Sequence, residues 1–255
     1  MSLTARSLSL FEAVLFGCKA GSLAGLLLGL LTVALISPVI LKAELFEQPT
    51  ADAVEAGHHH DAAAEEFTPN DWQRPVLTVV GAWLIGISFG ILASVVVFLG
   101  LTFDFIPAVQ SVRWWKAGLL FGGLGFLIFQ GIPALGLKPE LPGIVGAEGD
   151  FAARQTWWLI SVVCSTAGLV VFALIDSLLP LQKLLRRSVA GMACAGLALV
   201  PFWLGVPVHS EVSTTPEPLR HQFLVLSLGI NAGFWLLLGG FLFYFLTTRQ
   251  ENKAA

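Results

Sequence analysis

Long uncharged runs alternate with short polar segments along almost the whole chain. A helix rises about 1.5 Å per residue, so roughly 20 apolar residues cross the hydrocarbon core of a bilayer, which is about 30 Å thick. Runs of about this length cover residues 20–41, 76–103, 117–137, 155–175, 188–206 and 223–246. The pattern therefore predicts an all-α integral membrane protein, a bundle of about six transmembrane helices in a single membrane domain, 1–255.

The composition supports this reading over six buried helices of a soluble core. Only 12% of the residues are charged and 56% are hydrophobic, and the mean hydropathy is +0.80. A soluble domain carries roughly 25% charged residues. The first run is longer than the apolar region of a signal peptide and no small-residue cleavage pattern follows it, so we expect a retained span.

The distribution of cations predicts the orientation. With six spans, nine of the 14 Lys and Arg residues fall on the side of the two termini and five on the other side. Cytoplasmic loops carry an excess of Lys and Arg, so we expect both termini in the cytoplasm. All five histidines and 13 of the 17 acidic residues then face outward. Such a surface attracts cations, although acidic outer loops are also common without this function.

The first outer loop, 42–75, contains the stretch "AGHHHDAAAEE". Imidazole and carboxylate groups bind first-row divalent ions, so His58, His59, His60 and Asp61 are candidate metal ligands. Adjacent side chains on a regular helix or strand point in different directions, which predicts a flexible site of low specificity. A solvated linker without a ligand is the alternative.

The first span carries glycines at every fourth position, Gly17, Gly21, Gly25 and Gly29. They lie in one stripe along a helix and permit close approach of another helix, from this chain or from another subunit, including a second copy in a homo-oligomer. Gln130 and Asn231 are the main polar residues within the spans. A midplane relay of acidic and histidine side chains is not visible.

Several motifs of other protein classes are missing from the sequence. There is no GxxxxGK[ST] phosphate-binding loop and no HExxH. Cys18, Cys164 and Cys194 are isolated and have no metal-site spacing. We therefore expect neither an enzyme nor a bound cofactor, and no nucleic-acid partner.

The outer loop 138–154 is the most specific part of the sequence. Pro133, Pro139 and Pro142 lack an amide hydrogen and are expected to prevent a continuous helix here. Irregular backbone at membrane depth must be buried in protein or line a wet cavity, which would place Glu140 at the mouth of a cavity. Trp157 and Trp158 are expected in the interfacial aromatic belt. A purely structural cap is the alternative.

The runs "GLKPELPG", "ARQTWW" and "STAGL" resemble the CbtA family, the predicted cobalt transporter subunits of bacteria, whose pattern here is similar to G-L-P-P-E-L-P-G and R-Q-x-W-W. The matching motif residues are Pro139, Leu141, Pro142, Gly143, Arg154, Gln155, Trp157 and Trp158. Further likeness lies in "SPVILKAELFE" through Pro38, Ala43 and Glu44, in "FTPNDWQR" through Pro69, Asp71 and Arg74, and in "INAGFWLLLGG" through Asn231, Phe234, Trp235 and Gly239.

Two departures from the family pattern concern possible ligands. Lys138 replaces the first proline of P-P-E-L-P-G, and Phe202 stands where the family commonly has a histidine. If that histidine binds metal, His209 in the following loop is a candidate replacement.

The resemblance implies a multi-pass protein of the bacterial inner membrane that takes up divalent cobalt, or nickel, for cobalamin synthesis. It also implies a small partner with one span and histidines, called CbtB. The implied ligands are Glu44, His58, His59, His60, Asp61, Glu140 and His209. A non-transporting scaffold that assembles another transporter, and a metal sensor, are the alternatives.

Overall fold

The computed structural model describes residues 8–46, 72–103, 113–141, 148–180, 182–207 and 215–254, which are almost entirely helical. Six helices are long and apolar enough to cross a membrane, as predicted: Leu10–Glu44, Gln73–Thr102, Trp114–Gly136, Phe151–Leu178, Lys183–Leu204 and Glu217–Arg249. The first begins at Leu10 and not near residue 20, because Ser9 and Glu12 form a capping box there.

Two of the spans are interrupted by π-helical turns. The first span comprises α1 (Leu10–Leu31), the π-helix η2 (Thr32–Ile36) and α2 (Ser37–Glu44). The third comprises α5 (Trp114–Phe126), the π-helix η4 (Leu127–Gly131) and α6 (Ile132–Gly136). The remaining spans are α4 (Gln73–Thr102), α7 (Glu148–Leu178), α8 (Lys183–Leu204) and α9 (Glu217–Ala254).

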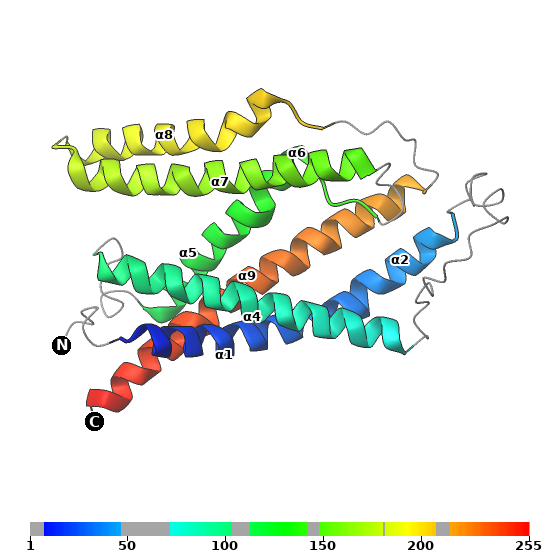
Figure 1. Ribbon diagram of the computed structural model, residues 1–255, viewed down its shortest axis with the longest axis horizontal. Helices are drawn as coiled ribbons and strands as arrows, with labels where there is room; N and C mark the ends of the chain where they lie inside the picture. Colours follow the sequence, from blue (N-terminus) through cyan, green and yellow to red (C-terminus); the bar gives the residue numbers. More distant parts are fainter. Residues whose placement is uncertain are drawn as a thin grey trace, which may run out of the picture.

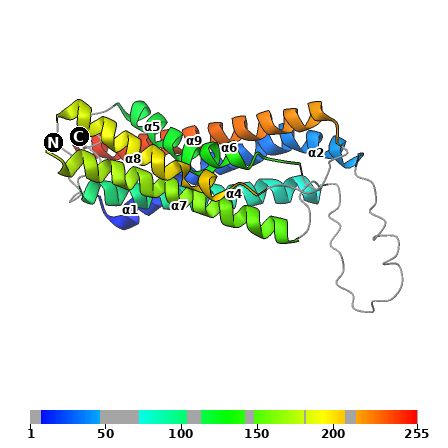
Figure 2. The ribbon, with the colours of Figure 1, turned by 90° about the horizontal axis from the view of Figure 1, so that it is seen from above.

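The helices form three main pairs, α1 with α4, α5 with α9 and α7 with α8. Figure 1 shows α1 with α4 on one side, the hairpin of α7 and α8 on the other, and α5 and α9 running obliquely between them. Helix α9 contacts α1 and α5, whereas the α7–α8 hairpin meets the other helices mainly at η4 and α6. Seen from above, the helices run side by side along the long axis (Figure 2). Helix α1 begins and α9 ends at the same end of the bundle, here called the termini end. The opposite end is called the pocket end, after the pocket described in the next section.

The glycine stripe of α1 lies against α4 of the same chain. A Cβ atom added at Gly25 would lie 2.8 Å from the Ala82 carbonyl oxygen, and one at Gly86 would lie 2.8 Å from the Gly25 nitrogen. The glycines at 17, 21 and 29 meet α4 in the same way, so the two helix backbones approach closely along their length.

An ion pair ties α1 to α9 at the termini end. The Arg249 guanidinium donates from Nη2 to Glu12 Oε1 at 2.6 Å and from Nε to the same oxygen at 3.1 Å. The Arg249 side chain is 10% exposed and that of Glu12 33%. The sequence analysis did not foresee this partly buried pair.

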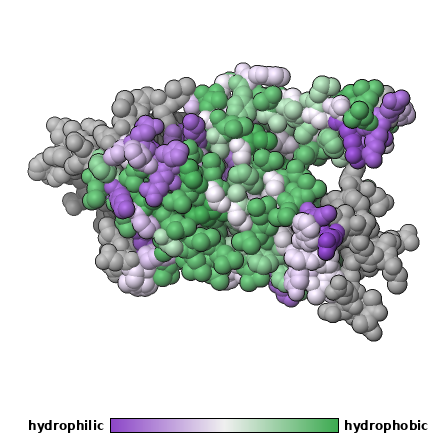
Figure 3. Space-filling model, turned by 180° about the vertical axis from the view of Figure 1, so that it is seen from behind, coloured by the Kyte–Doolittle hydropathy of each residue, from purple (hydrophilic) through white to green (hydrophobic). Residues whose placement is uncertain are grey.

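The surface has the polarity of a membrane protein. Figure 3 shows an apolar band around the middle of the molecule, with polar side chains gathered toward the two ends. Many large apolar side chains are exposed, among them Leu120 at 67%, Leu135 at 73% and Met192 at 67%. This band is the surface expected to face lipid, because the helices have no other apolar neighbour there within the described part of the chain.

Candidate functional site

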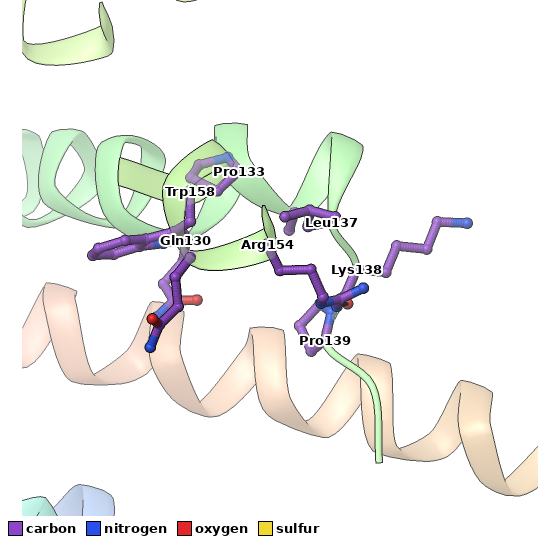
Figure 4. A pocket seen from close by; sticks show the side chains of 9 residues that line it. Gln130, Pro133, Leu137, Lys138, Pro139, Arg154 and Trp158 are labelled. Atoms are coloured by element: carbon purple, nitrogen blue, oxygen red, sulfur yellow. Dashed lines mark hydrogen bonds between the residues drawn. The ribbon is translucent and has the colours of Figure 1, made fainter. Parts of the chain in front are cut away.

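A pocket of about 300 Å³ lies at the pocket end between the third span and α7 (Figure 4). Its wall is formed by Gln130, Pro133, Ala134, Leu137, Lys138, Pro139, Arg154, Gln155 and Trp158. Four of these residues, Pro139, Arg154, Gln155 and Trp158, belong to the sequence motif described above. The motif therefore surrounds a real cavity.

Arg154 connects the two walls of the pocket. Its Nη1 atom lies 3.3 Å from Glu140 Oε2, and its Nη2 atom donates to the Lys138 carbonyl oxygen at 3.4 Å. The side chains of Arg154 and Glu140 are only 16% and 30% exposed. In Figure 4 Arg154 extends toward Lys138 and Pro139, whereas the Lys138 ammonium group points away. Glu140 is thus held by the guanidinium group of Arg154, a residue of the pocket wall.

Trp158 compensates for a proline inside the third span. Pro133 was expected to help end the helix, but the helix continues through it to Gly136. Proline removes the hydrogen bond to the carbonyl group four residues earlier, which is that of Phe129. The Trp158 Nε1–H donates to this Phe129 oxygen at 3.1 Å. The indole bond thus satisfies the carbonyl group freed by Pro133, and the predicted interruption of the helix comes after Gly136, where the backbone becomes irregular through Leu141.

An aromatic cluster lies on the termini side of the pocket. Phe129 stacks on Trp235 of α9 at a centroid distance of 5.1 Å and meets Phe89 of α4 edge to face at 5.1 Å. Trp158 contacts the same Phe129 ring at 6.5 Å. Such aromatic pairs stabilise packing beyond their buried area. Phe129 directly precedes Gln130 of the pocket wall, so this cluster adjoins the pocket.

Trp157 was expected in the interfacial aromatic belt, but it lies inside the protein. It is 4% exposed and packs between three helices. Its Nε1–H donates to the Pro201 oxygen of α8 at 3.0 Å. A Cβ atom at Gly136 would lie 2.8 Å from its Cζ2 atom. Phe202, which replaces the family histidine, meets the Trp157 ring edge to face at 5.3 Å. Trp157 therefore joins α6, α7 and α8.

Leu141 anchors the chain that leaves the pocket. It is 1% exposed and belongs to one apolar cluster with Val39 and Ala43 of α2 and with Phe223 and Ile230 of α9. The residue after Glu140 is therefore fixed beside the helix that ends in Glu44.

Glu44 is held by an arginine as well. Arg74 Nη1 donates to Glu44 Oε2 at 3.3 Å, and Arg74 Nη2 also contacts Glu44 Oε1. The two side chains are more exposed than the pair at the pocket, at 51% for Arg74 and 36% for Glu44. The sequence analysis treated both glutamates as metal ligands and did not recognise their arginine partners. The signal that could have revealed them is an arginine at the start of the span that follows each glutamate.

The other candidate ligands lie outside the described residues. These are His58, His59, His60, Asp61 and His209, together with the motif residues Pro142 and Gly143. Within the described segments no three His, Cys, Asp or Glu side chains gather into a metal-binding group. Of the two polar candidates within spans, Gln130 lines the pocket and Asn231 donates to the Ser227 carbonyl oxygen at 2.8 Å.

The comparison with protein-family models decides the family. Residues 11–247 match the model described as "Probable cobalt transporter subunit (CbtA)". The chain belongs to the CbtA family. It is accordingly a multi-pass membrane protein of a family of transporter subunits, and the word subunit implies a partner protein. No curated protein and no solved structure matches the chain significantly.

Proposed function

We propose that this protein is a subunit of a cobalt uptake transporter in the bacterial inner membrane, with the pocket end outside and both termini in the cytoplasm. The family match and the cation distribution support this orientation and role. In this arrangement the acidic and histidine-bearing outer loops collect the divalent ion, with nickel as the alternative cargo and cobalamin synthesis as the consumer. A small one-span partner bearing histidines completes the transporter.

The observation that carries the proposal is the Glu140 carboxylate held by Arg154, which lines the pocket. A divalent cation competes with a guanidinium group for the same carboxylate, because it carries twice the charge in a smaller volume. Once Arg154 turns away from Glu140, its positive charge no longer opposes cation entry. The amide oxygens of Gln130 and Gln155 in the pocket wall then supply further oxygen ligands, which suit divalent ions.

In this proposal the aromatic cluster of Phe129, Trp235 and Phe89 closes the way from the pocket toward the termini end, so passage of the ion requires these rings to move. The π-helix η4, which carries Phe129, is the element suited to this movement, because π-helical turns often occur at functional sites.

The test is the cobalt content of washed cells that express the protein with its one-span partner, measured by mass spectrometry. Glu140→Gln should lower accumulation strongly at an equal level of inserted protein. Glu217→Gln is the matched control, because Glu217 pairs with Arg220 at the same end of the bundle but is 85% exposed and lies away from the pocket wall. Equal accumulation in wild type and Glu140→Gln would refute the proposed role of Glu140.

If wild-type cells accumulate no cobalt although the protein is inserted, transport itself is refuted. The scaffold and sensor alternatives would then take its place.

A further inference from the structure

The first and third spans share an unusual sequence of local structures. Each contains a five-residue π-helix, η2 in the first and η4 in the third, followed at once by a helix whose second residue is proline. π-helices make up well under about 1% of residues in globular proteins. Each ends two residues before a proline, Pro38 or Pro133, which removes a backbone donor at the same point of both spans, and this shared position makes the two spans alike.

The likeness continues to the end of each span and into the next one. Pro38 is followed by "VILKAEL" and Pro133 by "ALGLKPEL", so that K-x-E-L recurs with one extra residue in the second copy. Glu44 and Glu140 occupy the same place in this pattern. Each pairs with an arginine near the start of the following span, Arg74 of α4 and Arg154 of α7.

Both copies lie against the same helix. The π-helices η2 and η4 each contact α9. At the pocket end, Ala43, which precedes Glu44, and Leu141, which follows Glu140, belong to one apolar cluster with Phe223 of α9. The two ion pairs are therefore placed at the same end of the bundle around the outer half of α9.

From this arrangement we infer that the first and third spans are copies of one unit, each followed by an arginine in the next span, and that Glu44–Arg74 is a second outer ion pair, equivalent to Glu140–Arg154, that an entering divalent cation must open. The inference rests on the proposed function and extends it to Arg74 and Arg154 as positioning residues. Each arginine holds its glutamate until a cation takes its place. The pair at Glu44 is the more exposed, so a cation arriving from outside meets it first.

If each arginine competes with the cation, substituting the arginine and substituting the glutamate should shift the cobalt affinity in opposite directions. An ion pair that only stabilises the structure predicts no such opposition. Removing the arginine leaves the carboxylate without its competitor, so Arg74→Gln and Arg154→Gln should lower the cobalt concentration for half-maximal binding. The more exposed pair, Glu44–Arg74, contributes up to about 1 kcal/mol, which corresponds to up to about fivefold in affinity for Arg74→Gln. Removing the carboxylate, as in Glu44→Gln and Glu140→Gln, should raise the same concentration. An ion pair that only stabilises the structure would shift the half-maximal cobalt concentration of all four variants in the same direction.

The experiment measures the melting temperature of the purified full-length protein in detergent against cobalt concentration, and the cobalt dependence of uptake in cells. Glu217→Gln and Arg220→Gln are the controls, since this pair at the start of α9 has no counterpart in the duplicated unit, and both should match wild type. Opposite shifts within both pairs support the inference.

Shifts of the same sign for Glu44→Gln and Arg74→Gln, or no shift in either, would overturn the inference. If Glu140 and Arg154 still shift in opposite directions, the proposed function survives that result. If wild-type cells take up no cobalt but the purified protein shows opposite shifts in both pairs, the proposed function fails and the duplicated cation site stands.

Discussion

Close packing of α1 on α4 predicts that glycine is required at some positions of α4 and not at others. The test compares Gly86→Ala with Gly81→Ala, both within α4. A Cβ atom at Gly86 would lie 2.5 Å from the Gly21 carbonyl oxygen and 2.8 Å from the Gly25 nitrogen, whereas one at Gly81 would meet nothing within 4 Å. Carbon atoms in contact are normally about 3.5–4.0 Å from their neighbours.

The two backbones must therefore move apart by roughly 1 Å in Gly86→Ala, by comparison with normal contact distances. Overpacking of this kind costs about 1–3 kcal/mol. Both variants gain the same helix propensity, about 1 kcal/mol for Ala over Gly, so this contribution cancels in the comparison. Gly86→Ala should be less stable than Gly81→Ala by about 1–3 kcal/mol, because only Gly86 faces backbone.

The measurement is unfolding of the purified protein in detergent micelles by increasing sodium dodecyl sulfate, followed by tryptophan fluorescence. Gly81→Ala should equal or exceed the wild type in stability. Equal free energies of unfolding for the two variants would show that α1 and α4 do not approach each other along this face, and the packing described above would be refuted.

Three further predictions concern single contacts. Trp157→Phe removes the hydrogen bond to the Pro201 oxygen and should lower the free energy of unfolding by about 1–3 kcal/mol, measured in the same titration; an unchanged value would show that the bond contributes nothing. Gly205 has a φ of 97°, so Gly205→Ala should cost about 1–3 kcal/mol although no atom lies within 4 Å of the added Cβ; wild-type stability would contradict this. Glu12→Gln should lower the melting temperature by weakening the tie to Arg249, and the loss should shrink in high salt; a salt-independent loss would point to packing.

The number and approximate position of the spans could be predicted from the sequence because each is a long uncharged run. The start of the first helix could not, because Lys19 ends the uncharged run but not the helix. The capping box at Ser9 lies eleven residues before the predicted beginning at residue 20. Hydropathy reports which residues tolerate lipid, whereas helix ends depend on local hydrogen bonds.

The candidate site was located by its motif, but the contacts within it could not be predicted. Glu140 and Glu44 were expected as metal ligands, and their arginine partners were not foreseen, because an ion pair between residues 14 or 30 positions apart has no local periodicity. The burial of Trp157 depends on the position of α8, which no pattern within α7 reveals. The bond from Trp158 to the Phe129 oxygen was not predictable either, because its indole donor comes from a different span.

The initial rate of radioactive cobalt entry into cells expressing this chain with the proposed one-span partner tests the central claim most directly. Cells with the wild-type pair should take up cobalt faster than cells with the partner alone, and Glu140→Gln should return the rate to that background. A wild-type rate equal to that of the partner alone, with the protein correctly inserted, would contradict the account.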